Sequence, residues 1–410
     1  MLVCISDLHF TDSSTGKYNV DARTFRNFWN KILETARGLN VREIELALLG
    51  DFFDLLHSRK WLEGSGEVKP WTEKGEGQLR VVEAILNDVF RGNEELLTYL
   101  AEISKSSDLD IKVTYIPGDH DWLINRYEGL REKVCKQLQL SHNPAERFPS
   151  FIRREEYHVF GRHGHEYDIY HFEGDYDAPS IGDAMVIELI NRFPDALAKT
   201  MGEKIDKALL QKLQRIEDVR PLLDTPGWIS AVAEESTVPE TADAIKACWD
   251  DLVNQFNHLA YVQQWYTVHD SWAPLDEADR LKERLKTASF ALKNPAGKST
   301  TSSKPIMSQF VREEDRHPRE AYNEDFIRHD PIQYVVLGHT HQGRVLSMDR
   351  INGVEKIYFN LGTWRSVHTR NKFGSEKVLF TSWRTLNYAV FYQEGEHPDQ
   401  AFEFWSAALR

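Results

Sequence analysis

Aspartate and histidine recur in five short motifs along this chain, and their types and spacing are typical of metal-ion chemistry. The motifs are Asp7-Leu8-His9, Gly50-Asp51-Phe52-Phe53-Asp54, Gly118-Asp119-His120-Asp121, His163-Gly164-His165 and Gly338-His339-Thr340-His341. Carboxylate oxygens and imidazole nitrogens together suit Mn, Fe, Zn or Ni, whereas a structural zinc site would favour thiolates. Two such ions about 3.5–4 Å apart can hold a phosphate and activate water between them. Such a pair needs roughly seven or eight protein ligands, which the five motifs can supply.

The spacing within the motifs also favours shared ligation. In Asp7-x-His9 and His339-x-His341, the two side chains lie on one face of an extended segment, because side chains alternate there. Glycines beside the acids and imidazoles allow the backbone to turn sharply. Each motif alone is weak evidence, since Asp or His at a strand end is more often a cap or a hydrogen-bonded surface group. Five motifs in the same kind of position make metal binding the stronger interpretation.

Each motif follows an apolar segment with the character of a β-strand. These segments are Leu2–Ile5, Glu43–Leu49, Ile111–Ile116, Tyr157–Phe160 and Gln333–Leu337. Helical patterns lie between the early ones, at Ala22–Leu39, Leu79–Ile103 (with a break near Gly92) and Leu123–Leu138. Strands that alternate with helices predict a largely parallel α/β sheet. The carboxyl ends of such strands share one edge of the sheet, so motifs far apart in sequence should converge there.

The chain changes character between the fourth and the fifth motif. From about residue 181 to 292 the pattern is almost entirely helical, and Pro295–Pro305 has the composition of a flexible connector. Strand signals resume later, at Lys356–Phe359, Lys377–Thr381 and Asn387–Tyr392. We therefore predict one discontinuous α/β domain at 1–172 and 331–410, interrupted by a mostly helical insertion at 173–330. The insertion is either a lid or substrate-selecting cap over the site, or a dimerisation or packing element that never touches substrate.

Composition limits the expected partners and location. The chain has 410 residues, a net charge of -14 and 41% hydrophobic residues, enough for a large core with an appended domain. The acidic charge disfavours non-specific binding to nucleic acid or anionic membranes, although two bound dications would reverse the sign locally. We find no signal peptide, no membrane-spanning run and only three cysteines, so we expect a cytoplasmic protein with no membrane partner. The sequence leaves the oligomeric state open.

In their order and spacing, the motifs resemble the calcineurin-like metallophosphoesterase superfamily. The pattern of that superfamily runs Asp-x-His, Gly-Asp-x-x-Asp, Gly-Asn-His-Asp/Glu, a lone His and Gly-His-x-His. The likeness spans Asp7 to His341 without the insertion, and Asn360-Leu361-Gly362-Thr363-Trp364 is similar to the turn that often follows the last block. It implies an α/β/β/α sandwich of two mixed sheets around a centre of two divalent metal ions. Mn²⁺ is the first expectation, with Fe, Zn or Ni as alternatives.

Carried over position by position, the resemblance also implies the roles of individual residues. The implied metal ligands are Asp7, His9 and His341 for the first ion, Asp119, His163 and His339 for the second, and Asp51 as the bridge between them. A hydroxide shared by the ions would attack phosphorus, and His120 would act as general acid or phosphate donor. Asp121 would orient His120, and Asp54 would support the ligands from outside. In the fourth motif we choose His163 as the ligand, because the family's ligand usually precedes the glycine.

Three further residues are candidates for substrate contact. His165 follows the fourth-motif glycine and is expected near the substrate. Arg162 directly precedes His163, and Arg59 lies in Ser58–Gln78, a predicted loop at the same sheet edge. Arginine is expected near a bound phosphate. Both arginines could equally be surface charges.

One position departs from the family pattern, because Asp119 stands where Asn is usual. Asn offers a carbonyl to the metal and an amide hydrogen to the phosphate, whereas an ionised Asp adds a negative charge and no donor. Three ligand carboxylates in place of two predict a less electrophilic pocket, which would either tolerate a more highly charged metal or favour a singly charged diester over a dianionic monoester. We therefore expect a phosphoesterase acting on a small or medium phosphodiester or nucleotide-like substrate. A DNA-repair-type nuclease, with nucleic acid as a less favoured partner, and a non-catalytic interaction scaffold remain alternatives.

Overall fold

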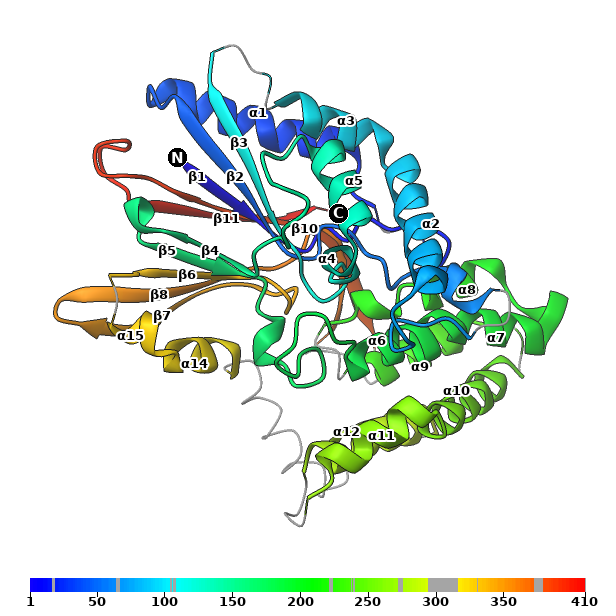
Figure 1. Ribbon diagram of the computed structural model, residues 1–410. Helices are drawn as coiled ribbons and strands as arrows, with labels where there is room; N and C mark the ends of the chain where they lie inside the picture. Colours follow the sequence, from blue (N-terminus) through cyan, green and yellow to red (C-terminus); the bar gives the residue numbers. More distant parts are fainter. Residues whose placement is uncertain are drawn as a thin grey trace.

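The computed structural model describes the chain except residues 17–18, 64–66, 104, 106–107, 221–223, 237, 239, 272–275, 294–315, 330, 372–378 and 410. It is an α/β protein in which two mixed sheets pack against each other and helices cover their outer faces (Figure 1). The first sheet has the strand order β11-β10-β1-β2-β3, with β9 paired to β10. The second has the order β4-β5-β6-β8-β7. The predicted α/β class with two mixed sheets is confirmed.

The first sheet joins the beginning of the described chain to its end. Its strands are β1 (Leu2–Ile5), β2 (Glu43–Leu49), β3 (Asp110–Ile116), β9 (Ser366–Arg370), β10 (Phe380–Phe391) and β11 (Phe402–Leu409). Strands β1, β2 and β3 are parallel, and β10 runs antiparallel to β1. The helices on its outer side are α1 (Ala22–Gly38), α2 (Glu76–Gly92), α3 (Glu94–Ile103), α4 (Leu123–Arg126) and α5 (Glu128–Leu138) (Figure 1).

The second sheet brings the fourth and fifth motifs together. Its strands are β4 (Phe151–Arg154), β5 (Val159–Arg162), β6 (Tyr334–Leu337), β7 (Gly343–Ile351) and β8 (Val354–Leu361). Strands β5, β6 and β8 are parallel neighbours. The short helices α14 (Arg316–Asn323) and α15 (Asp325–His329) lie on its outer side (Figure 1). Parallel pairing of β5 with β6 places the ends of both strands, and the motifs that follow them, at one edge.

An apolar layer between the two sheets holds the sandwich together. Leu2, Leu49 and Ile116 of the first sheet are buried in one cluster with Val336 and Phe359 of the second. Strands β1 and β6 are buried at every position, which is why their sequences are continuous apolar runs. Burial on both faces makes these strands a rigid base for the residues that follow them.

Most predicted elements of the α/β portion are confirmed, with corrections at the edges of the sheets. The run Tyr157–Phe160 is not one strand, because a 3₁₀ turn ends at Tyr157 and β5 covers Val159–Arg162. Of the segments expected at 377–381 and 387–392, residues 380–381 and 387–391 belong to the single strand β10. Strands β4, β7, β9 and β11 had no prediction. The connector at Pro295–Pro305 lies outside the described residues.

Between the fourth and fifth motifs the described chain is helical, as expected. Its elements are α6 (Ile181–Met185), the π-helical turn η4 (Val186–Asn191), α7 (Arg192–Met201), η5 (Gly202–Lys204), α8 (Lys207–Leu213), η6 (Ile216–Asp218), α9 (Thr225–Glu234), α10 (Thr241–Asn257), α11 (Ala260–His269) and α12 (Glu277–Lys293). They share an apolar cluster that includes Phe193, Trp249 and Trp265. In the described part of the chain, no helix combines the length and apolar character that crossing a bilayer requires.

Candidate metal centre

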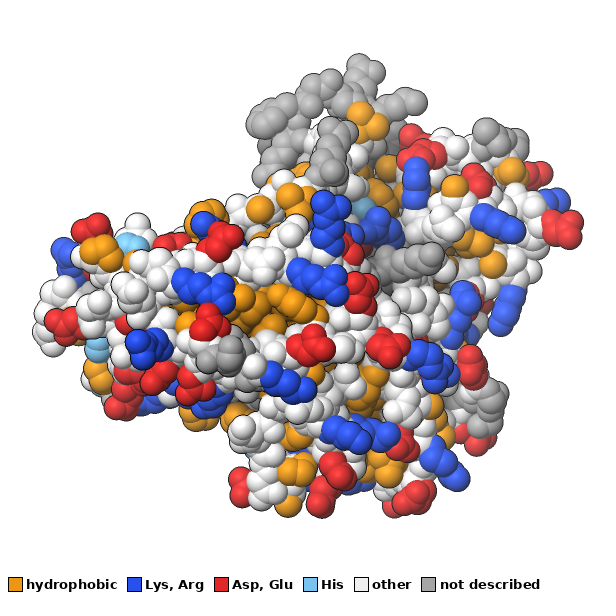
Figure 2. All heavy atoms as spheres, turned by 90° about the horizontal axis from the view of Figure 1, so that it is seen from above, with side chains coloured by type: hydrophobic (Ala, Val, Ile, Leu, Met, Phe, Trp, Pro, Cys, Tyr) orange, Lys and Arg blue, Asp and Glu red, His pale blue; other side chains and the backbone are white. Residues whose placement is uncertain are grey.

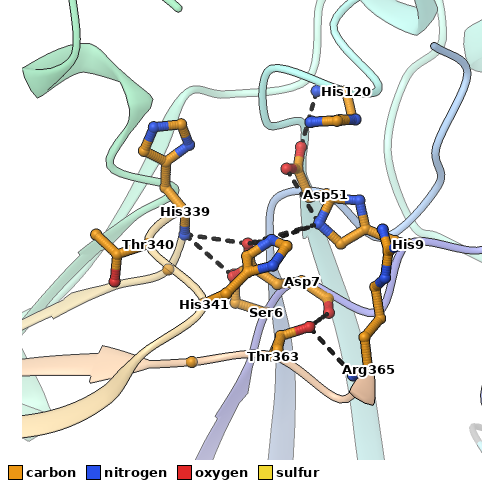
Figure 3. A network of polar contacts seen from close by, with 12 residues as sticks. Ser6, Asp7, His9, Asp51, His120, His339, Thr340, His341, Thr363 and Arg365 are labelled. Atoms are coloured by element: carbon orange, nitrogen blue, oxygen red, sulfur yellow. Dashed lines mark hydrogen bonds and ion pairs between the residues drawn. The ribbon is translucent and has the colours of Figure 1, made fainter. Parts of the chain in front are cut away.

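The five motifs meet at one edge of the sandwich, where the strands that precede them end. The first three follow β1, β2 and β3 of the first sheet, and the other two follow β5 and β6 of the second. Figure 3 shows Asp51, His9 and His341 facing one another at this edge, although they come from three different strands. Six of the seven predicted ligands are fully or almost fully buried, and the side chain of His339 is 9% exposed.

Asp7, His9 and His341 form the first group of ligand atoms. The Nε2 atoms of His9 and His341 lie 2.9 Å apart, and Nε2 of His341 lies 3.3 Å from Oδ1 of Asp7. One ligand atom from each of the three residues falls within 4.8 Å of the others. This compact set of one carboxylate and two imidazoles could hold a metal ion.

Asp119, His163 and His339 form the second group. Oδ1 of Asp119 lies 3.0 Å from Nε2 of His163 and also 3.0 Å from Nδ1 of His339. Their ligand atoms likewise fall within 4.8 Å of one another. The structure therefore brings together each trio that the family resemblance implied for one ion.

Asp51 lies between the two groups. Its Oδ2 is 3.5 Å from Nε2 of His9 and 3.2 Å from Nε2 of His163, so a single oxygen faces one imidazole of each group. Its Oδ1 accepts a hydrogen bond of 2.8 Å from the backbone N–H of His120, which fixes the carboxylate in this orientation (Figure 3). Buried carboxylates and imidazole lone pairs that converge in this way are the donor set that divalent cations take in proteins.

Backbone strain is concentrated at these ligands. Ten of the described non-glycine residues have a positive φ, and five of them are predicted metal ligands, namely Asp7, His9, Asp51, His339 and His341. The left-handed region is costly for side chains other than glycine and persists only where the surrounding structure enforces it. The buried strands before each turn supply that enforcement. Strain that gathers at one cluster is typical of a functional site.

Two motif glycines are required because the ligands approach the backbone closely. A Cβ atom on Gly118 would overlap Oδ1 of Asp51, and one on Gly338 would overlap Oδ2 of Asp7. Each glycine therefore leaves the space in which a carboxylate of another strand sits. This explains why both the third and the fifth motif begin with glycine.

The orientation of His120 differs from the prediction. Its Nδ1 lies 3.1 Å from Oδ1 of Asp54, whereas Asp121 accepts hydrogen bonds from the backbone N–H of Gly118 (2.5 Å) and the hydroxyl of Tyr115 (2.8 Å). Asp121 points back under its own turn, so it stabilises the turn and does not orient His120. The orienting role that we assigned to Asp121 therefore belongs to Asp54.

The carboxylate of Asp54 lies within hydrogen-bond distance of three imidazoles. Besides His120, its carboxylate lies 3.0 Å from Nδ1 of His9 and 2.7 Å from Nδ1 of His57. A carboxylate on the far nitrogen of a ligand histidine fixes the ring and its tautomer. Burial alone would lower the pKa of His57, but Asp54 and Glu217 outweigh it and raise that pKa to about 9. No motif singles out His57, which stands three residues after Asp54.

The three predicted substrate contacts have different outcomes. His165 is buried beside the second group, and it lines a hollow together with Asp119, Trp122 and Phe172. Arg162 instead forms an ion pair of 2.9 Å with Glu324 on the outer side of the second sheet, because side chains alternate and His163 takes the inner side. Arg59 pairs with Asp195 of α7 at 2.5 Å. Neither arginine is placed at the metal ligands.

His171 is a residue that the sequence analysis missed. Its Nδ1 lies 2.8 Å from Oδ2 of Asp119, so the two oxygens of this carboxylate serve different partners. Asp168, three residues earlier, lies 3.5 Å from Nε2 of His339. His171 lies shortly after the fourth motif in the sequence, which could have drawn attention to it. Its spacing from His165, however, matches no motif.

The helical insertion reaches the site through the segment Ile216–Arg220. Oε2 of Glu217 lies 2.6 Å from Nε2 of His57, and the guanidinium of Arg220 donates to Nδ1 of His341. The insertion therefore contacts the candidate ligand His341 directly. It also contacts His57, which shares the carboxylate of Asp54 with the candidate ligand His9.

Comparison with known proteins adds no assignment. Neither a scan against protein-family models nor a search of curated proteins finds a match for this chain. Its chemistry is accordingly argued from its own residues, of which the buried Asp and His groups could hold metal ions.

Proposed function

We propose that this chain is a metal-dependent phosphoesterase of the calcineurin-like superfamily that works with two divalent cations, Mn²⁺ first among them. The observation that carries the proposal is Asp51, whose Oδ2 faces both His9 and His163. Each trio could hold a single ion by itself. A carboxylate oxygen that lies between the two trios is the feature that a dinuclear centre needs in addition. Fe, Zn and Ni fit the same donors.

The residues around the groups have separate tasks in this proposal. Bound cations would supply a Lewis acid and the positive charge that a phosphate requires. Asp54 holds His120 through Nδ1, which leaves Nε2 of His120 to donate to the leaving-group oxygen or to the phosphate. His165 and His171, beside Asp119 in the same hollow, exclude water and contact the rest of the substrate. The expected substrate is a small or medium phosphodiester or a nucleotide-like ester.

A nucleic-acid substrate has less support than a small ester. The net charge is -14, and basic and acidic side chains are intermixed on the face seen in Figure 2 rather than gathered in a basic stripe. Binding to the phosphates of a duplex depends on clustered lysine and arginine. A non-catalytic scaffold is also less favoured, because all seven ligand positions hold Asp or His.

Hydrolysis of bis-p-nitrophenyl phosphate beside p-nitrophenyl phosphate, with Mn²⁺ supplied, tests the proposal. We expect turnover that falls by about three orders of magnitude in Asp51→Asn, because both metal positions depend on this carboxylate. Asp110→Asn is the matched control, since Asp110 is an exposed aspartate at the opposite end of β3. Metal content, measured by mass spectrometry, should fall in the first variant only.

Two results would count against the proposal. Absence of turnover of both esters with Mn, Fe, Zn and Ni would remove the enzymatic function and favour a binding role. Equal turnover by the wild-type protein and Asp51→Asn would mean that the activity does not arise at this centre.

A further inference from the structure

We propose that Arg220, which the helical insertion supplies, binds the phosphate group of the substrate at the metal centre. The inference rests on the proposed function and adds to it the residue that receives the substrate's charge. It also gives the insertion a role in substrate binding, since Arg220 lies between η6 and α9. No motif in the sequence singles this arginine out.

The segment that carries Arg220 is held firmly against the site. Val219 forms a parallel bridge with His368 of β9, and the backbone N–H of Arg220 donates to the carbonyl of His368 at 2.9 Å. Asp218 pairs with Arg365 at 2.8 Å, and both side chains are 1% exposed. Backbone pairing and a buried ion pair therefore fix the position from which the Arg220 side chain extends.

The charge of Arg220 is buried and forms no direct ion pair among the described residues, although Glu217, Asp218 and Asp7 lie close enough to act on it electrostatically. Its guanidinium donates to the carbonyls of Glu217 and Val219 and to Nδ1 of His341, and the residue is 9% exposed. The neighbouring acids are engaged elsewhere, because Glu217 lies 2.6 Å from His57 and Asp218 pairs with Arg365. A buried cation with only neutral acceptors is unfavourable, and an anion beside it removes that cost.

The present contact with His341 is incompatible with metal binding through Nε2 of the same ring. A neutral imidazole has one nitrogen with a lone pair and one that carries hydrogen. Nε2 is the atom that faces Asp7 and His9, so a cation at the first group would use its lone pair. Nδ1 would then carry the hydrogen, and the guanidinium, which only donates, would need other acceptors.

A phosphate at the two cations supplies those acceptors. Its oxygens match the planar fork of a guanidinium, which can donate two parallel hydrogen bonds to them. The two arginines that the sequence suggested for this role are already paired, Arg162 with Glu324 and Arg59 with Asp195. Arg365, which also lies close to the site, pairs with Asp218. The position of Arg220, its positive charge and its need for hydrogen-bond acceptors thus all favour it as the residue that binds the phosphate.

The test is calorimetric binding of inorganic phosphate to the Mn²⁺-loaded full chain. We expect Arg220→Gln to weaken phosphate binding roughly ten- to hundredfold, as for the loss of a charge-assisted bidentate contact. Arg220→Lys, which keeps the charge but loses the fork, should lie between. Arg192→Gln is the matched control, because Arg192 also belongs to the insertion and pairs with Glu188 at 2.8 Å. Bound Mn²⁺ is counted in every variant.

The possible outcomes separate this inference from the proposed function. Wild-type phosphate affinity in Arg220→Gln at full metal content would overturn the role of Arg220 and leave the phosphoesterase intact. A wild-type protein that binds Mn²⁺ but no phosphate would overturn the role of Arg220, and hydrolysis of the two nitrophenyl esters would then decide the proposed function. If Arg220→Gln loses metal, Arg220→Lys decides, since weaker phosphate binding at full metal content supports the inference and unchanged binding refutes it.

Discussion

Asp119 shows how much one side chain can change the chemistry of the centre. One of its oxygens faces His163 and His339, and the other accepts from Nδ1 of His171 at 2.8 Å. An ionised carboxylate has no hydrogen to donate, so His171 must be the donor. The extra negative charge expected from Asp in place of Asn is thereby partly balanced by a histidine that the family pattern does not include. Preference between phosphoesters should depend on this pair.

Replacement of Asp119 by Asn should shift ester preference toward monoesters. Removal of one negative charge near the phosphate favours a dianion over a monoanion, and we expect the monoester-to-diester ratio of kcat/KM to rise about tenfold. The measurement uses the two nitrophenyl esters with Mn²⁺. Asp175→Asn is the control, because Asp175 lines the same hollow but is exposed. An unchanged ratio in Asp119→Asn would show that Asp119 does not set this preference.

At the scale of elements, the site is built by strands that end in strained turns. Burial of β1 and β6 at every position anchors the backbone, so Asp7, His9, His339 and His341 can be held at positive φ. The same turns bring carboxylates so close to neighbouring strands that only glycine fits opposite them. Ligand geometry therefore depends on backbone positions that make no contact with a substrate.

Gly118→Ala should disrupt the centre without removing any ligand. The added Cβ would overlap Oδ1 of Asp51 and displace the carboxylate that faces both groups. A displacement of about 1 Å can cost on the order of a hundredfold in rate, and metal affinity should fall with it. Gly129→Ala is the matched control, since a Cβ at Gly129 in α5 meets nothing within 4 Å. Full activity and metal content in Gly118→Ala would show that the turn tolerates the shift.

At the scale of the whole molecule, residues from both sheets and from the helical insertion meet at the candidate centre. His9 and His341 are 332 positions apart in sequence and belong to different sheets, yet their Nε2 atoms lie 2.9 Å apart. The insertion adds a third contributor through Glu217 and Arg220. A cation bound here would join both sheets, and the insertion would be linked to it through His57 and His341.

Removal of metal should therefore lower the thermal stability of the whole chain. A ligand that binds only the folded state at a thousandfold its Kd contributes about 4 kcal/mol. We expect a chelator to lower the Tm seen by calorimetry and added Mn²⁺ to restore it. The Tm of Asp51→Asn should respond much less, because its centre holds metal poorly. An equal response in both proteins would place the stabilising metal elsewhere.

The sequence by itself determined the α/β class, the strands before each motif and the residues that gather at the edge. These depend on local signals, namely apolar runs, glycine and the alternation of side chains, which short segments carry on their own. The strands without a prediction have weaker signals. In β7, for example, no position is buried, and Arg344, Asp349 and Arg350 interrupt any apolar pattern.

Only the tertiary structure decided which partner each charged side chain meets. Asp54 rather than Asp121 holds His120, Arg162 turns away to Glu324, and Arg220 arrives from the insertion. Each outcome depends on contacts between residues distant in sequence, and no local periodicity encodes them. A charge is placed by the full set of acceptors and donors around it in three dimensions, and that set exists only once the chain has folded.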